Sequence, residues 1–243
     1  MQPTIEAWDV HKGFGTGSAW RSILGGVSLT VARGETVYLV GRSGSGKTTL
    51  LSILGCILTP DRGSVRILGQ DPAQLNVAQR ASFRGRNLGF IFQSFNLFPT
   101  LSALDNIVLA LSAQGVGRKA AVLQAETMLE QVGLSQRIRV RPAQLSTGEC
   151  QRVAIARALA GNPEVIFADE PTASLDTENG QVVLQLLTGM VRARGASLVV
   201  VTHDNRIFPF ADRILELEDG RLKQEQAPHT GTQRRSMMKG LVA

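Results

Sequence analysis

Residues 41–48 of the chain read GRSGSGKT and match the pattern G-x-x-x-x-G-K-[ST] in full. The apolar run TVYLV comes directly before them, at positions 36–40, and predicts a buried strand. The helix-forming stretch Lys47–Leu58 follows. A glycine-rich turn between a strand and a helix presents backbone N–H groups at the positive end of the helix dipole. We therefore expect this turn to hold a phosphate group, and not merely to close a strand–helix connection.

Each position of this phosphate turn has a chemical role. Glycines without a Cβ let the backbone wrap closely around an anion. We expect Lys47 to neutralise the β and γ phosphates of ATP and the Thr48 hydroxyl to ligate Mg²⁺. The predicted nucleotide-binding residues of the turn are Gly41, Arg42, Ser43, Gly44, Ser45, Gly46, Lys47, Thr48 and Thr49.

Two carboxylates follow a second apolar run, VIFA at 165–168. Asp169 comes directly after this predicted buried strand, so we expect it to hold the Mg²⁺ shell together with Thr48. Glu170 can accept a proton from the water that attacks the γ-phosphate, which is general-base catalysis. On their own the two residues could equally be surface carboxylates that open a loop. The phosphate turn favours the catalytic interpretation.

Short apolar runs alternate with helical stretches along most of the chain, which favours an α/β fold with a mostly parallel, doubly wound sheet. Alternating apolar residues in RILELEDGRL, at 213–222, predict a hairpin near the end of this pattern. Between about 94 and 160 the character changes. Helical periodicity at 103–114 and 119–133 is not interrupted by a strong strand, which predicts an inserted helical segment.

Composition limits the functional classes. No apolar run approaches the roughly 18 residues of a membrane span, and the start MQPTIEAW does not resemble a secretory signal. We therefore expect the chain in the cytoplasm unless a partner holds it elsewhere. Cys56 and Cys150 suggest neither a metal site nor a disulfide framework, so we expect reduced packing residues. A net charge of +6 permits nucleic acid or anionic lipid as a partner, but the basic residues are scattered, which favours a solvated surface.

Further motifs follow the phosphate turn in a fixed order. They are FIFQ ending at Gln93, LSTGE at 145–149, SLD at 174–176 and VVVTHD containing His203. The carboxylate pair Asp169–Glu170 lies between LSTGE and SLD. Together they resemble the ATP-binding cassette (ABC) ATPases over residues 4–223. The resemblance implies a P-loop NTPase (RecA-like) fold: a mostly parallel sheet with an antiparallel N-terminal β part and an inserted helical subdomain.

The same resemblance implies the domain limits. Residues 1–225 would form a single ABC ATPase domain, in which 1–93 and 161–225 are the RecA-like core and 94–160 the helical signature subdomain. Residues 226–243 carry no convincing pattern, and we expect them to be a mobile tail.

The resemblance also assigns roles to single residues. Gln93 is expected to contact Mg²⁺ and the attacking water, and His203 the γ-phosphate. Phe14 of HKGFG is expected to stack on adenine, with Trp20 close enough to compete, and Asp176 belongs to the D-loop. Without the shared order, these residues would be a strand-end amide, a loop histidine, a core aromatic and a helix cap.

LSTGE opens a second helix of phosphate-binding character, although the chain already has the phosphate turn. In the family two cassettes face each other head to tail, so that this signature loop reaches the γ-phosphate bound by the other. The resemblance therefore implies a homodimer that closes on ATP through Ser146 and Gly148 and opens after hydrolysis. Thr147 stands where the family usually has glycine. It could add a hydrogen bond or crowd the site.

The stretch GFIFQSFNLFPTLSALDNIVLAL, at 89–111, resembles the branch of lipoprotein-releasing and macrolide-exporting ABC systems. This implies a peripheral ATPase on the cytoplasmic face of the inner membrane, bound to integral membrane permease subunits. A groove beside Gln93 would hold the permease's short cytoplasmic coupling helix. We expect Phe95, Leu97, Phe98 and Pro99 to line this groove, or to form an apolar corner within the insertion.

Two other functions of an ABC ATPase fit the same motifs. One is a cell-division-type ATPase that transmits force without transport. The other is a soluble ABC ATPase acting on nucleic acid or ribosomes, which usually has a second cassette, long coiled coils or zinc inserts, none of which is visible here. We therefore expect no nucleic-acid partner. A P-loop kinase would leave LSTGE without a role.

Overall fold

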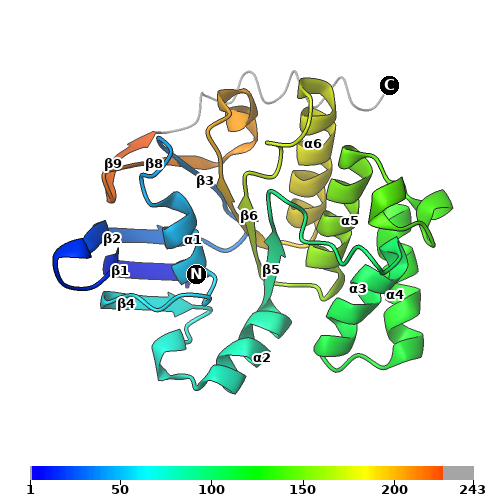
Figure 1. The fold of residues 1–243 in the computed structure, drawn as a ribbon, viewed down its shortest axis with the longest axis horizontal. Coiled ribbons are helices and arrows are strands. Elements are labelled where there is room, and N and C mark those ends of the chain that lie inside the picture. Colours follow the sequence, from blue (N-terminus) through cyan, green and yellow to red (C-terminus); the bar gives the residue numbers. More distant parts are fainter. Residues whose placement is uncertain (1, 227–243) are drawn as a thin grey trace.

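The computed structural model describes residues 2–226, which form two β-sheets and a layer of helices (Figure 1). The smaller sheet is antiparallel, with the order β2-β1-β4, and the larger has the order β5-β6-β7-β3-β8-β9. The smaller sheet contains β1 (Ile5–Phe14), β2 (Arg21–Val31) and β4 (Arg62–Ile67). The larger contains β3 (Thr36–Val40), β5 (Leu88–Ile91), β6 (Val165–Asp169), β7 (Ser197–Val201), β8 (Arg213–Glu218) and β9 (Arg221–Gln226).

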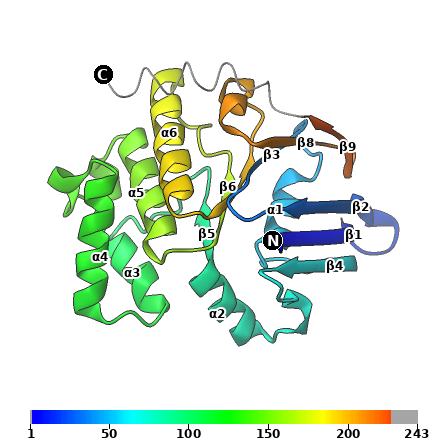
Figure 2. The ribbon, with the colours of Figure 1, turned by 180° about the vertical axis from the view of Figure 1, so that it is seen from behind.

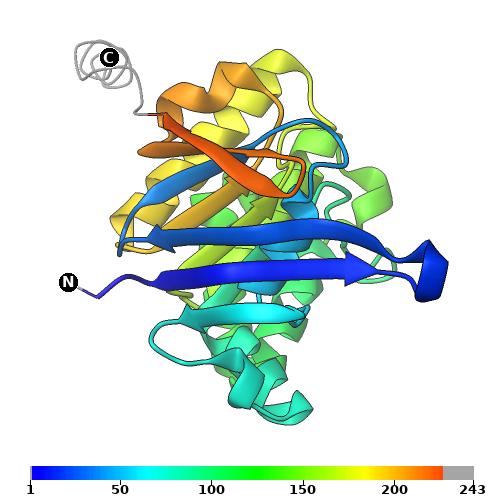
Figure 3. The ribbon, with the colours of Figure 1, turned by 90° about the vertical axis from the view of Figure 1, so that its left-hand side faces the viewer.

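Neighbouring strands of the larger sheet are parallel except for the hairpin β8–β9. Figure 3 shows the smaller sheet from its outer side, with its strands crossing the molecule side by side. The predicted fold class, a mostly parallel sheet with an antiparallel N-terminal part and inserted helices, is confirmed. Strand β9 extends to Gln226, one residue beyond the predicted domain end, and the rest of the predicted tail, 227–243, lies outside the described residues.

The central strands are apolar throughout because both faces of the larger sheet are covered. In β6, Ile166 and Ala168 belong to one core cluster, and Val165 and Phe167 to the other. The first cluster lies beneath the helices, and the second lies between the two sheets. Alternate residues of one strand therefore support opposite layers, as expected for a buried parallel strand.

Helix α1 (Lys47–Leu54) lies between the two sheets and contacts β1, β2 and β4 on one side and β6 and β7 on the other (Figure 1). The prediction that this helix reaches Leu58 is wrong. It ends at Leu54 with Gly55 as its C-cap, and the next residue, Cys56, has a left-handed φ of 58°. Apolar residues continue past this turn and preserve the helical pattern, although the backbone has already left the helix.

Helices α5 (Thr147–Ala160) and α6 (Thr177–Ala193) pack on the opposite face of the larger sheet. Helices α3 (Ala103–Ala113) and α4 (Arg118–Gln131) pack against α5 on its side away from the sheet, as the view from behind shows (Figure 2). Helix α5 approaches the sheet edge so closely that a Cβ on Gly89 of β5 would lie 2.6 Å from the Ala158 carbonyl oxygen. This contact brings the last turn of α5 against the start of β5.

Helix α2 (Val77–Asn87) was not predicted, because it is polar overall and buries no residue completely, although Phe83 packs partly buried against the core. It begins with a capping box in which Asn76 and Gln79 exchange side-chain and backbone hydrogen bonds. Short 3-10 helices complete the described elements: η1 (Gly17–Ala19), η2 (Pro72–Gln74), η3 (Ser135–Arg137), η4 (Pro142–Gln144) and η5 (Asn205–Phe210). None of the described helices has the length and apolarity needed to cross a membrane. Cys56 and Cys150 are free and buried.

Candidate nucleotide-binding site

The phosphate turn joins β3 to α1 in a conformation that its glycines allow. Gly41, Gly44 and Gly46 have φ values of 147°, 80° and 102°. A Cβ on Gly41 would lie 2.1 Å from the Leu217 carbonyl oxygen, so a larger residue does not fit there. Gly46 is the N-cap of α1 and offers no side-chain cap to the first N–H groups of the helix. These groups are therefore available to an anion.

Lys47 lies across the turn. Its ammonium group donates hydrogen bonds to the carbonyl oxygens of Gly41 and Arg42, each at 2.8 Å, and the residue is buried. The hydroxyl of Ser45 is also buried, and among the described residues it has no hydrogen-bond partner. A buried polar group without a partner is unusual in a native protein. A bound phosphate would supply acceptors to both side chains, so the turn is arranged for an anion.

Thr48 and Asp169 form the predicted metal-binding pair. Asp169 ends β6, and the Thr48 hydroxyl donates to its carboxylate across 3.4 Å. Burial raises the pKa of Asp169, and the neighbouring Glu170 charge raises it further, while the Thr48 hydrogen bond and the Lys47 charge lower it. A hydroxyl and one carboxylate, completed by phosphate oxygens and water, are ligands that Mg²⁺ prefers. The two residues therefore fit a magnesium ion bound together with a nucleotide.

Glu170 follows Asp169 in a strained conformation. Its φ is 48°, in the left-handed region that residues with a Cβ rarely adopt, and its backbone N–H donates to the Val201 carbonyl oxygen at 2.9 Å. The carboxylate lies 2.7 Å from Nδ1 of His203, and the Glu170 side chain is 16% exposed against 71% for His203. Strain of this kind is found preferentially at functional sites. The two predicted catalytic residues are thus brought into direct contact.

Gln93 follows β5 and is exposed. Its carbonyl oxygen accepts a hydrogen bond from the Ser174 hydroxyl at 3.3 Å, which connects it to the segment before Asp176. Its side-chain amide makes no hydrogen bond within residues 2–226. In the next segment Leu97 packs against the helical core, whereas Phe98 is 53% exposed. The apolar corner and the exposed apolar surface therefore both exist here.

Phe14 ends β1 and is 46% exposed, with the Lys12 ammonium group 5.6 Å from the centre of its ring. Trp20 is 52% exposed, and its ring lies against Gly13, where a Cβ would come within 2.3 Å of it. The two aromatic rings predicted to compete for adenine are therefore both accessible, on adjacent parts of the first strand pair.

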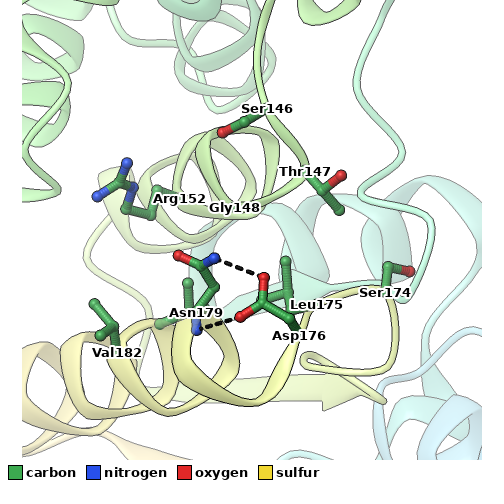
Figure 4. Close-up of a pocket in the computed structure, with 10 residues that line it drawn as sticks. Ser146, Thr147, Gly148, Arg152, Ser174, Leu175, Asp176, Asn179 and Val182 are labelled. Atoms are coloured by element: carbon green, nitrogen blue, oxygen red, sulfur yellow. Dashed lines mark hydrogen bonds between the residues drawn. The ribbon is translucent and has the colours of Figure 1, made fainter.

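Ser146, Gly148 and Asp176 line a separate cavity of about 210 Å³ between α5 and α6 (Figure 4). Thr147, Arg152, Ser174 and Asn179 also line it. Within residues 2–226 no hydrogen bond joins Ser146 or Gly148 to the phosphate turn. The structure thus separates Ser146, Gly148 and Asp176, at the starts of α5 and α6, from the predicted nucleotide-binding residues of the phosphate turn.

Both helices at this cavity are capped by predicted site residues. At α5, Glu149 N donates to the Ser146 hydroxyl at 3.2 Å, and Ser146 N donates to the Glu149 carboxylate at 2.8 Å. This second bond is the main reason that the pKa of Glu149 is lowered. At α6, the Asp176 carboxylate accepts from the side chain of Asn179 at 2.7 Å and from its backbone at 3.0 Å. Asp176 is therefore the helix cap that its sequence context suggested.

Gly148 is not required by the fold of a single chain. A Cβ there would meet Asn179 at 3.8 Å, an ordinary contact, and its φ is not in the left-handed region. This differs from Gly41, where the backbone itself excludes a side chain. The open space at Gly148 suits the close approach of another molecule.

Comparison with known proteins relates the two groups of residues to one family. The family model described as "ABC transporter" matches residues 24–173, which is more than half of the chain. The lipoprotein-releasing system ATP-binding protein LolD of Geobacter metallireducens is 44% identical over 222 residues, covering 91% of this chain and 99% of that protein. The chain belongs to the ABC transporter family. The family predicted from the ordered motifs is thereby confirmed, and with it the interpretation as an ATP-binding ATPase cassette.

Other relatives of the cassette differ in length. The macrolide export ATP-binding/permease protein MacB 1 of Aeromonas hydrophila is 44% identical over 90% of this chain, which spans only 34% of that protein. YbbA of Escherichia coli, an uncharacterized ABC transporter ATP-binding protein, is 45% identical over 91% of this chain and 97% of its own length. A solved dimeric structure of the cassette MJ0796 in a post-hydrolysis state with ADP and Pi has a TM-score of 0.86 and 37% identity, covering 93% of this chain and 100% of that one.

Sequence reasoning missed two arginines of the cassette. Arg152 lines the cavity one helical turn after Gly148, and the i, i+4 spacing could have revealed it. Arg157 donates hydrogen bonds to the carbonyl oxygens of Phe95 and Asn96, in the segment after Gln93. No spacing rule joins residues about sixty positions apart, so the sequence alone carries no signal for this second contact.

Proposed function

We propose that the cassette binds Mg-ATP at the phosphate turn and hydrolyses it with Glu170 as general base. The contact between Glu170 and His203 beside the Thr48–Asp169 pair supports this assignment. Glu170 accepts the proton of the attacking water, while His203 orients the carboxylate and contacts the γ-phosphate. Gln93 contributes its free side-chain amide to the water and the metal. Thr48 and Asp169 would hold Mg²⁺, which would supply positive charge next to the β and γ phosphates.

Adenine would stack on Phe14. The ring is accessible, and the Lys12 ammonium group over it is paired with the Asp61 carboxylate at 2.7 Å. Trp20 lies next to the same position and would contact the edge of the base. Aromatic stacking of this kind is tolerant of the exact base, so most of the binding energy would come from the phosphates.

A homodimer completes the site. The observation that carries this proposal is the separate cavity at Ser146 and Gly148, which combines a helix N-terminus with open space that the single chain does not use. A second cassette, facing head to tail, would bring its γ-phosphate to this helix start. The solved relative MJ0796 is dimeric with ADP and Pi, which supports such an arrangement. ATP binding would then close the dimer, and hydrolysis would release it.

The membrane partner would be an integral permease. The relatives LolD and MacB 1 are named for lipoprotein release and macrolide export. The exposed Phe98 and its neighbours after Gln93 would accept a short cytoplasmic helix of the permease. The cassette would therefore lie on the cytoplasmic face of the inner membrane, without crossing it. A division-type relative would use the same contact to transmit force.

The decisive experiment measures ATP turnover of the purified cassette with and without the membrane protein that copurifies with it. We expect the partner to bind and to stimulate hydrolysis. Phe98→Ala should abolish the stimulation while leaving basal turnover intact, because Phe98 lies outside the nucleotide site. Failure of the partner to bind, or stimulation that does not depend on Phe98, would contradict the proposed contact.

A further inference from the structure

The segment after Gln93 turns sharply through two consecutive residues in the left-handed region. Phe95 and Asn96 have φ values of 59° and 47°. A left-handed conformation is tolerated by asparagine but is a genuine outlier for a bulky residue such as phenylalanine. Such a turn persists only where surrounding contacts hold it. The contacts that hold this turn therefore decide where Gln93 and the exposed Phe98 lie.

Two buried or half-buried polar side chains hold the segment, one from each side. At its far end, Asn106 of α3 accepts from Phe98 N at 2.7 Å and donates to the carbonyl oxygens of Phe98, Leu101 and Ser102. At the turn itself, Arg157 of α5 donates through Nη1 to the Asn96 carbonyl oxygen and through Nη2 to that of Phe95, the latter at 2.8 Å. The left-handed turn presents both carbonyls to one side, which suits the planar fork of a guanidinium.

Within residues 2–226 the Arg157 side chain makes no hydrogen bond or ion pair other than these two. It is half-buried, and no carboxylate of the described chain lies within ion-pair distance of it. Burial lowers its pKa, in keeping with a cation that has lost water without gaining a counter-ion. A desolvated arginine costs free energy unless its donors are well satisfied. The two carbonyl bonds supply this compensation, so contact with the turn is the main role of the side chain.

Helix α5 joins this contact to the signature loop. The helix begins at Thr147, capped by Ser146, and it is continuous to Ala160. Gln151, on the same helix, is fully buried and donates to the Pro171 carbonyl oxygen, directly after Glu170, at 2.8 Å. One rigid helix thus connects the signature loop, the segment of the catalytic glutamate and the turn after Gln93.

We propose that Arg157 is a positioning residue that locks the turn after Gln93 to the signature helix, so that Gln93 and the signature loop move as one unit. This inference rests on the proposed function for its effect on hydrolysis. Closure of the dimer at Ser146 would then bring Gln93 towards the nucleotide. In the same way, a permease helix pressing on Phe98 would displace the signature loop through Arg157.

The test uses the full chain and three variants. Arg157→Met removes the fork but keeps the apolar stem, and Arg157→Lys keeps the charge but not the two-pronged geometry. Arg194→Met is the matched control. Arg194 is also partly buried, with a pKa lowered by burial, and it donates to Met190 and Gln131, away from the site. Thermal unfolding of all three shows whether they are folded.

The first readout is hydrogen–deuterium exchange of the nucleotide-free protein. In Arg157→Met we expect the amides at 94–98 to exchange about tenfold faster or more, because two charge-assisted hydrogen bonds are lost. Arg157→Lys should give an intermediate rate, and Arg194→Met should leave 94–98 unchanged. Equal exchange at 94–98 in Arg157→Met and Arg194→Met would overturn the proposal.

The second readout is ATP hydrolysis. We expect Arg157→Met to lower kcat about tenfold with KM unchanged, because Gln93 is misplaced while the phosphate turn is intact. Arg157→Lys should recover part of kcat. A purely structural role predicts that kcat follows the fall in Tm equally in Arg157→Met and Arg194→Met, and that result would overturn the proposal. The exchange measurement needs no nucleotide, so it tests the contact between Arg157 and the turn even if the wild-type chain does not hydrolyse ATP. An inactive wild-type chain would contradict only the proposed function.

Discussion

The strained backbone at Glu170 places its carboxylate against His203 and leads to a direct test. Glu170→Gln keeps the size of the side chain and removes its basicity. We expect ATP to bind normally and hydrolysis to fall by about 10²- to 10⁴-fold, the usual contribution of a general base. Trapped by unhydrolysed Mg-ATP, the variant should elute as a dimer in size-exclusion chromatography.

Glu164→Gln is the matched control, because Glu164 precedes the same strand but pairs with Arg33 on the surface. Its turnover should equal that of the wild type. A Glu170→Gln protein that stays monomeric in saturating Mg-ATP would count against closure of two facing cassettes.

The raised pKa of Asp169 predicts that the stability of the nucleotide-free protein depends on pH. Its pKa is raised, mainly by burial, above the ordinary value of 3.8. The folded protein therefore binds more protons at this position than the unfolded chain. The Asp169 contribution to stability should be most favourable below pH 3.8 and should fall as pH rises from there to the raised pKa.

Asp169→Asn should therefore raise the Tm of the nucleotide-free protein at neutral pH while it abolishes hydrolysis. The measurement is thermal unfolding across pH with and without Mg-ATP. A lower Tm for Asp169→Asn without nucleotide would show that burial of this carboxylate is not costly.

The sequence predicts some residues of the site better than others, and the reason is distance along the chain. The phosphate turn and the Asp169–Glu170 pair lie in short windows where residue order alone implies the chemistry. Arg157 and the carbonyls that it contacts are about sixty residues apart, and Gln151 acts on the carbonyl of Pro171. A hydrogen bond from a side chain to a backbone carbonyl cannot be predicted from the sequence of the accepting segment, because every residue has a carbonyl.

Helices α3 and α5 permit a comparison of elements. Each is capped by a serine, since Ser102 accepts from Asp105 N and Ser146 accepts from Glu149 N. Replacing either serine by alanine should cost about 1 kcal/mol of stability. Only Ser146→Ala should also lower ATP turnover, by roughly tenfold or more, because only this cap is expected to meet a phosphate. Urea unfolding and steady-state hydrolysis of the two variants separate these effects. Equal ATP turnover in both variants would show that Ser146 acts only as a helix cap.

Element boundaries were predicted less well than element types. The central strands are apolar on both faces, so their positions follow from the sequence. Helix α2 escaped prediction because it is polar overall, and its stability comes from the Asn76 capping box and its docking beside β5. The end of α1 was misplaced for the opposite reason, since apolar residues persist after the backbone turns at Cys56.

The separation of the phosphate turn from the signature cavity makes a prediction for the whole molecule. Lys47→Ala and Ser146→Arg should each be inactive alone, because one lacks the phosphate turn and the other the signature loop. Mixed together, they form heterodimers in which one composite site keeps both intact parts. Random exchange should restore roughly a quarter of wild-type turnover. The measurement is ATP hydrolysis against mixing ratio, with each variant mixed with itself as control. Absence of recovery in heterodimers shown to form would exclude shared sites.

The aromatic residues of the chain are few and unevenly placed. There is one tyrosine, Tyr38, buried in β3, and two tryptophans, of which Trp8 is 73% exposed on β1 and Trp20 lies beside Phe14. The indole of Trp20 is therefore a natural optical probe of the proposed adenine position, and Trp8→Phe would leave it as the sole strong emitter. Titration with nucleotide should then quench or shift its fluorescence, so occupancy could be followed in solution, in real time, with no dye attached.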